Sequence, residues 1–259
     1  MSKTNAAVPV MLKELRALLE SRADDKTRLS IVSSQPKSPV KTLGVRPSTL
    51  KTVSKEFFAK NRAGIDYAGA VALVDSAVAR KTREEILVAL EVLERFRRDF
   101  TPALFAHLDK WSAIADDLEI AEAIGTKVAA PLLAVDPSRI SAVKKWAKLR
   151  GTGRRRLALL AACGLVTDGR RMAAPVLEVC ELLMNEENPL LVSAVAALLR
   201  ETTKVDAKAV QDFLFRRSID GNPDILRAGS ENLDAARRAA LIAKLEAQAL
   251  AAPIAAVGR

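Results

Sequence analysis

The sequence predicts an all-α protein, and two observations support this fold class. Apolar residues recur at steps of three and four positions nearly everywhere after residue 47, which is the spacing of one helix face. Sustained alternation of apolar and polar residues, the pattern of a half-buried strand, is hard to find. Helix breakers also fall between the periodic segments. Pro102 and Pro137 lie in or near predicted first turns, and Gly151 and Gly153 lie in a connection.

The predicted elements follow in chain order. A helix is expected at about residues 10–21 of an N-terminal segment, 1–22, and the Ser- and Pro-rich stretch 23–46 has no helical period, so we expect a long connection there. Helices resume at Pro47, because the fixed φ angle of proline suits a first helical turn. The remaining helices are expected at residues 65–80, 83–98, 101–114, 117–134, 137–149, 154–165, 171–186, 189–203, 206–217 and 233–250.

Pairs of these helices recur at fairly even intervals, although no sharp sequence repeat is present. This arrangement is typical of the degenerate helical hairpins of HEAT-type repeats, which stack into a curved α-solenoid. Because the connections are short, neighbouring helices are expected to be antiparallel. We therefore expect one domain, 1–259, in which residues 47–250 form HEAT-like antiparallel helix pairs with a concave basic face and residues 251–259 form a tail. An ordinary globular helical bundle is the alternative.

Composition narrows the class of protein further. A chain of 259 residues with 49% hydrophobic residues has enough apolar surface to bury a core, so disorder of the whole chain is not expected. Cys163 and Cys180 lie in apolar runs and are predicted to be buried thiols, which favours a reducing, cytoplasmic location. The apolar run 157–166 is far shorter than the roughly 20 residues that a membrane span needs, so no membrane association is expected.

The charge pattern indicates a polyanionic partner. The formal net charge is +10, and seven basic residues without an intervening acid lie between positions 144 and 156. These are Lys144, Lys145, Lys148, Arg150, Arg154, Arg155 and Arg156. A second basic cluster lies between Lys37 and Arg62 and includes Arg46, with Lys51 and Lys55 four positions apart on one helix face. For any single lysine a solvated helix face is the simpler interpretation, but two clusters could converge on the concave side of a curved array.

Four segments resemble motifs of a known family. KTLGVRPSTLKTVSKEFF resembles the opening motif of the DNA alkylation repair family of HEAT-like DNA glycosylases. DLEIAEAIGTKVAAPLL, KKWAKLRGTGRRRLALL and LLRET are similar to three later segments of that family. The resemblance covers roughly residues 40–230; its spacing is specific, while individual identities are modest.

The resemblance implies a function and a set of site residues. Members of the family are expected to grip duplex DNA on a concave basic face and to release cationic N3- or N7-alkylated purines, using an aspartate, an arginine and two tryptophans. The arginine corresponds to Arg156, with Trp146 at the matching distance before it, and the aspartate corresponds to Glu122. The two tryptophans correspond to Leu118 and Ala197, so the aromatic walls of the site are lost.

These correspondences define the candidate site. Glu122 is the candidate catalytic carboxylate; Asp116 is a rival, and a plain surface carboxylate is the alternative role for Glu122. The candidate nucleic-acid-binding residues are Arg156, Arg155, Arg154, Arg46, Lys51, Lys55 and Lys148. Trp111 and Trp146 are expected to pack in the core.

Three functions remain open at the level of sequence. The first is a monofunctional glycosylase acting on alkylated purines, the second is a non-catalytic protein that binds branched or distorted DNA, and the third is a protein-protein scaffold. No metal or organic cofactor is expected, because His107 is the only histidine and the two cysteines are far apart. Phosphate-binding loops and the motif of a serine nucleophile are not found in the sequence.

Overall fold

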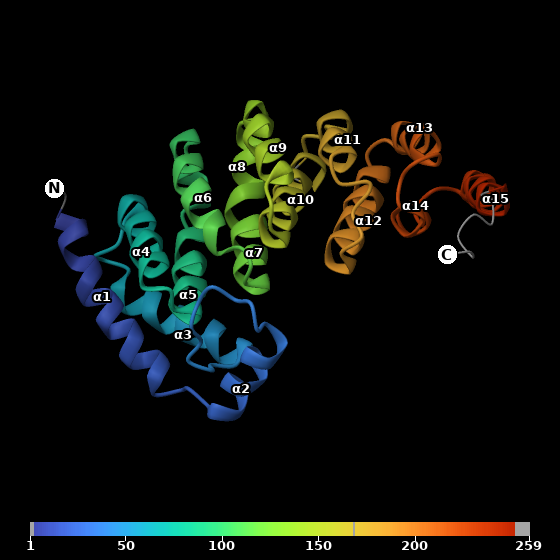
Figure 1. Cartoon of the computed structure of the whole chain (residues 1–259). Helices are drawn as coiled ribbons and strands as arrows, with labels where there is room; N and C mark the ends of the chain where they lie inside the picture. The colour runs from blue at the N-terminus through green and yellow to red at the C-terminus, as the bar shows by residue number, and fades with distance from the viewer. Residues whose placement is uncertain (1–2, 168, 252–259) are drawn as a thin grey trace. The chain divides into compact units, whose positions relative to one another are not determined.

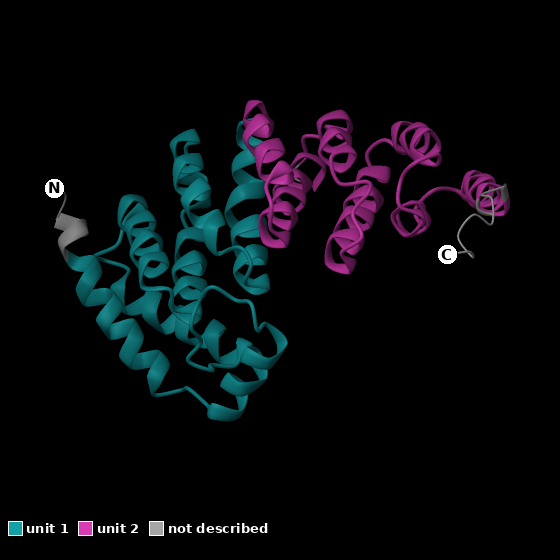
Figure 2. Ribbon diagram, viewed as in Figure 1, with its two compact units in different colours: residues 1–136 teal, residues 137–259 magenta. Residues whose placement is uncertain are grey.

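The structure is a computed structural model that describes residues 3–167 and 169–251, and Figure 1 shows that these residues are built from helices. Within the described residues no strand is present beyond a single bridge between Lys41 and Thr82. The predicted all-α fold class is therefore confirmed. The chain divides into two compact units, residues 1–136 and 137–259 (Figure 2).

Unit 1 contains two rows of helices. One row consists of α1 (Lys3–Glu20), α4 (Tyr67–Arg80) and α6 (Phe105–Trp111), and the other consists of α3 (Pro47–Asn61), α5 (Arg83–Glu94) and α7 (Leu118–Ile124). Helices in each row contact their neighbours, and α4 packs on α5 across the rows. The other elements are α2 (Asp25–Ser34), α8 (Ala130–Val135), the π-helix η4 (Gly125–Ala129) and the 3₁₀ turns η1 (Arg97–Asp99), η2 (Pro102–Leu104) and η3 (Ser112–Ile114).

Unit 2 repeats the same two-row packing. After the 3₁₀ turn η5 (Pro137–Arg139), one row consists of α9 (Ile140–Lys148), α11 (Ala173–Glu181), α13 (Ala207–Arg217) and α15 (Ala235–Ala251). The other row consists of α10 (Thr152–Thr167), α12 (Pro189–Thr203) and α14 (Pro223–Gly229). From α9 to α13, each helix of unit 2 contacts the next helix in the chain across the two rows.

Each unit has its own apolar core. Trp111 is 1% exposed in unit 1 and Trp146 is 2% exposed in unit 2, which confirms that both pack inside the protein. Cys180 is fully buried, and burial raises the pKa of its thiol. Cys163 was also predicted to be buried, but it is half-buried. Among the described helices, none combines the length and the apolar character that a bilayer span requires.

The stretch 23–46 is not the unstructured connection that its composition predicts, because it contains α2. The Asp24 side chain caps this helix by accepting hydrogen bonds from the backbone N–H groups of Lys26 and Thr27. No residue of α2 is buried, so the helix has no apolar face that periodicity could reveal.

Two further differences concern helix boundaries. The sequence Gly221-Asn222-Pro223 was predicted to be a connection, but Asn222 is the N-cap of α14 and Pro223 occupies its first turn. The predicted helix 117–134 is interrupted by the wide turn of η4, where the Ala130 N–H donates to the carbonyl of Gly125, five positions back. Pro131 follows directly, and a proline there removes the regular helical hydrogen bond and crowds the preceding turn.

Residues 35–45, which we call the strap, join α2 to α3. Between these helices the strap forms hydrogen bonds to the N-terminal ends of α5 and α7. The fully buried carboxylate of Glu84, at the start of α5, accepts hydrogen bonds from the strap at Thr42 Oγ1 (2.5 Å), Leu43 N (2.9 Å) and Gly44 N (3.0 Å). At the start of α7, Gln35 Oε1 accepts from Leu118 N over 2.7 Å. The strap therefore fixes α5 and α7 through polar contacts, in addition to the apolar packing of its last residue, Val45.

Candidate active site and basic clusters

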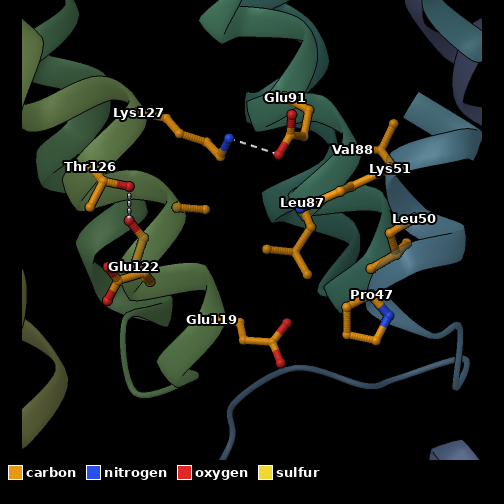
Figure 3. A pocket seen from close by; sticks show the side chains of 11 residues that line it. Pro47, Leu50, Lys51, Leu87, Val88, Glu91, Glu119, Glu122, Thr126 and Lys127 are labelled. Atoms are coloured by element: carbon orange, nitrogen blue, oxygen red, sulfur yellow. Dashed lines mark hydrogen bonds and ion pairs between the residues drawn. The ribbon is translucent and has the colours of Figure 1, made fainter. Parts of the chain in front are cut away.

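A cavity of about 230 Å³ opens in unit 1 between α3, α5 and α7 (Figure 3). Its surface is mostly apolar, with charged groups from all three helices. The lining residues are Pro47, Leu50 and Lys51 of α3, Leu87, Val88 and Glu91 of α5, Glu119, Glu122 and Ala123 of α7, and Thr126 and Lys127 of η4. The cavity thus combines a low-dielectric wall with three carboxylates and two ammonium groups.

Glu122 is half-buried in this cavity and lies in the last turn of α7. Its backbone carbonyl accepts a hydrogen bond from Thr126 Oγ1 over 2.7 Å, which links it to the first residues of η4. Lys51 lies on the opposite wall, on α3, and Figure 3 shows its side chain extending toward the middle of the cavity. The structure therefore brings together the candidate catalytic carboxylate and one of the predicted DNA-binding lysines, which are 71 positions apart in the chain.

The neighbouring carboxylate Glu91 has a fixed partner. The ammonium group of Lys127 lies 2.7 Å from Glu91 and 2.6 Å from Glu94, so η4 is attached to α5. Burial lowers the pKa of Lys127, but the hydrogen bonds to the two glutamates outweigh it, and the pKa lies above the ordinary value. Lys127 therefore remains charged at neutral pH, and it offsets part of the negative charge at the cavity.

Arg83 positions the start of α7. Its side chain is 1% exposed, its Nε lies 3.4 Å from Asp117 Oδ2, and its guanidinium group forms an ion pair with Glu119 at the cavity. Asp117 is also the N-cap of α7, where it accepts from Ile120 N, and it receives a hydrogen bond of 2.9 Å from Ser38 Oγ of the strap. The role of Arg83 could not be predicted from the sequence, because its partners are more than 30 positions away and a basic residue at a helix start is usually exposed.

The basic residues predicted in unit 1 lie on or next to α3. Lys51 and Lys55 are exposed on this helix. Arg46, just before the helix, has a side chain that is 68% exposed and lies 3.5 Å from Asp24. The pKa of Asp24 is lowered, chiefly by the hydrogen bond from the Thr27 side chain and also by the charge of Arg46. These three basic side chains are accessible to a ligand.

The basic residues predicted in unit 2 lie at the turn from α9 to α10. Lys148 ends α9 and is exposed, while Arg154, Arg155 and Arg156 are half-buried near the start of α10. Arg155 forms a close ion pair with Glu186, and its Nε donates to the carbonyl of Gly151 over 3.4 Å.

Acidic residues that are distant in sequence offset part of this cluster. Lys144 forms a close ion pair with Glu178 of α11, in addition to the pair between Arg155 and Glu186. The run 144–156 contains no acidic residue, and its acidic partners lie outside it. The positive charge that is available to a ligand is therefore smaller than the sequence of the run suggests. The positions that correspond to aromatic residues hold Leu118, half-buried at the start of α7, and Ala197, half-buried in α12.

By its fold the protein is an all-α protein of paired helix rows, with a carboxylate-lined cavity in unit 1 and exposed basic residues in both units. The family model described as "DNA alkylation repair enzyme" matches residues 15–233, and the chain belongs to this family. Comparison with curated proteins gave no match.

A solved structure supports the fold. The chain is similar to a protein described as a predicted DNA alkylation repair enzyme from Enterococcus faecalis, with a TM-score of 0.65 over 83% of this chain and 98% of the other. The two sequences are 13% identical, so this likeness concerns the fold alone.

Proposed function

We propose that the protein binds DNA through its two basic clusters. Membership of the family and the net charge of +10 support a polyanionic ligand. In this proposal the helix pairs of the whole chain form one curved HEAT-like α-solenoid whose inner face carries Arg46, Lys51 and Lys55 together with the cluster around Arg156. Phosphate contacts of this kind are independent of sequence, and each one releases condensed counterions.

The enzymatic part of the proposal is the excision of N3- or N7-alkylated purines, with Glu122 as the catalytic residue. The observation that carries it is the position of Glu122 in a mostly apolar cavity, with the exposed cation Lys51 on the opposite wall. Cleavage of the glycosidic bond develops positive charge on the sugar, and a fixed carboxylate in a low-dielectric site stabilises that charge. An alkylated purine that is already cationic leaves readily, so no protonation of the base is required.

The expected result for Glu122→Gln is a loss of about 10²-fold in the rate of base release, the size of effect seen when one preorganised electrostatic group is removed. The measurement is the formation of abasic sites in duplex DNA that contains N7-methylguanine, under single-turnover conditions. Glu20→Gln is the matched control, because Glu20 lies in unit 1 with a side chain 58% exposed and away from the cavity. Release by the wild-type protein at the spontaneous rate would remove the enzymatic part of the proposal.

A second candidate function is non-catalytic binding of branched or distorted DNA. It is favoured by Leu118 and Ala197, which supply no aromatic wall against the deoxyribose. In this case DNA binding would persist without base release, and junction DNA would be bound more tightly than a regular duplex.

Salt dependence tests the DNA-binding part separately. The logarithm of the binding constant is expected to fall by about 0.9 for each neutralised phosphate per unit of log salt concentration, and Arg156→Ala should reduce this slope by about one. Lys204→Ala serves as the control, because Lys204 is an exposed lysine of unit 2 outside the basic cluster. An affinity that does not change between low and high salt would favour a protein-protein scaffold instead.

A further inference from the structure

A second cavity lies in unit 1, in the row of helices that does not carry Glu122. It has a volume of about 360 Å³ and is formed by α4, α6 and the residues that precede α6. Its lining includes Tyr67, Val71, Asp75, Thr101, Leu104 and His107. None of the described residues that line it also lines the cavity of Glu122. This second cavity therefore has no role in the proposed DNA binding or base excision.

The polar centre of this cavity is a carboxylate held by two aromatic side chains. Trp111 Nε1 donates to Asp75 Oδ1 over 2.8 Å, and His107 Nδ1 lies 2.9 Å and 3.1 Å from the two oxygens of Asp75. The indole of Trp111 is 1% exposed and packs against the imidazole, with 5.9 Å between the ring centroids. Asp75 and His107 thus have fixed orientations, although each side chain is about one third exposed.

These contacts determine what the cavity offers to a ligand. A carboxylate only accepts hydrogen bonds, so His107 Nδ1 carries the proton that it shares with Asp75. A carboxylate has about four acceptor positions, and Trp111 and His107 do not occupy all of them. The hydroxyl groups of Tyr67 and Thr101 can accept as well. The cavity is therefore rich in acceptors and carries the negative charge of Asp75.

The rest of the lining is complementary to a compact apolar body. Val71 and Leu104 contribute an aliphatic surface, and Tyr67 contributes an aromatic ring. The described lining residues include no lysine or arginine that would neutralise Asp75. An anionic ligand would be repelled here, whereas a donor-rich cation would gain charge-assisted hydrogen bonds.

We propose that this cavity binds a small organic cation, with a primary ammonium group on a compact apolar or aromatic body. The ammonium group donates to Asp75, which His107 and Trp111 hold in place, while the body packs on Val71, Leu104 and the ring of Tyr67. A volume of about 360 Å³ lies at the small end of ligand-binding cavities, which suits a ligand of this size. The site is independent of Glu122, so failure of the proposed glycosylase activity would leave this inference intact.

The test uses benzylamine and the full-length protein labelled with ¹⁵N. The chain has two tryptophans, so its spectrum has two indole N–H signals: Trp111 reports on Asp75, and Trp146 in unit 2 is an internal control. Benzylamine is expected to shift the Trp111 signal in a saturable way and to leave the Trp146 signal in place. Benzyl alcohol, which has the same shape without the charge, is expected to bind at least about tenfold more weakly.

Variants of the protein test Asp75, which binds the ammonium group, and His107, which orients Asp75. Asp75→Asn is expected to raise the dissociation constant of benzylamine about tenfold or more. Asp109→Asn changes the net charge equally, on the neighbouring α6, and is expected to leave the dissociation constant unchanged. His107→Phe keeps a ring but removes the Nδ1–H that orients Asp75, and it is expected to weaken binding less than Asp75→Asn does. Circular dichroism melting curves identify any variant that has lost its fold.

Three results would overturn the proposal. The first is the absence of a saturable shift of the Trp111 signal in the wild-type protein. The second is equal binding of benzylamine and benzyl alcohol, which would mean that the cavity recognises only apolar shape. The third is unchanged binding in both folded variants, Asp75→Asn and His107→Phe.

Discussion

Replacing Gly44 by alanine is expected to lower the free energy of unfolding of unit 1 by about 3–5 kcal/mol. The φ angle of Gly44 is +87°, a left-handed conformation that costs a residue with a Cβ atom about 1–2 kcal/mol. A Cβ atom there would lie 2.6 Å from the carbonyl oxygen of Asp24 and 2.7 Å from the backbone N of Arg28. These backbone atoms belong to the start of α2 and cannot move without breaking its cap, so overpacking adds a few kcal/mol more.

Gly169→Ala is the matched control for this prediction. Gly169 has a similar φ angle of +79°, but a Cβ atom there would meet no atom within 4 Å. Its cost should be limited to the backbone term, about 1–2 kcal/mol. The measurement is urea unfolding with equal m-values, followed by circular dichroism. Equal destabilisation by the two substitutions would show that the close approach of the strap to α2 contributes nothing.

Replacing Glu84 by alanine should destabilise unit 1 by a similar amount, about 3–5 kcal/mol. The carboxylate of Glu84 is fully buried and is the acceptor for the N–H groups of Leu43 and Gly44 and for the hydroxyl of Thr42. Removing it would take the acceptor from one buried and two half-buried donors, and each such loss costs about 1–3 kcal/mol.

The control for this substitution is Glu14→Ala. Glu14 is a glutamate of unit 1 whose side chain is 38% exposed and which pairs with Lys60 across 3.2 Å. Surface pairs of this kind contribute about 0–1 kcal/mol, so the control should unfold almost as the wild type does. Glu84→Gln retains an acceptor oxygen and should fall between the two. A loss of less than about 1 kcal/mol in Glu84→Ala would contradict the view that polar contacts hold the strap in place.

The segment Gly44-Val45-Arg46 shows which properties of a motif can be predicted from sequence and which cannot. Its resemblance to a family motif was visible, but its physical role was not. Gly44 provides the left-handed turn and the close contact with α2, Val45 is fully buried, and Arg46 is the N-cap of α3. The start of α3 at Pro47 was predicted correctly because proline marks a first turn by its own geometry.

The parts of the site that sequence could not predict depend on long-range contacts. Asp75 and His107 are 32 positions apart, and only the packing of α4 against α6 brings them together. Similarly, Glu186 offsets Arg155 from a separate segment, so the free charge of the basic run could not be judged from the run itself. The shared cavity of Lys51 and Glu122 likewise follows from the packing of α3 and α7 on α5.

The wide turn of η4 has a consequence for how this helix tolerates changes in length. A π turn holds one residue more than an α turn, and one residue corresponds to a rotation of about 100° around the axis. In a regular helix, losing one residue would rotate α7 relative to α8 by about that angle, but the wide turn already absorbs one residue, so a deletion between Gly125 and Ala129 would restore regular helix with little rotation. The buried leucines of α8 and the carboxylate of Glu122 would then nearly keep their present directions, so this helix is expected to tolerate the loss of one residue here better than anywhere else along it.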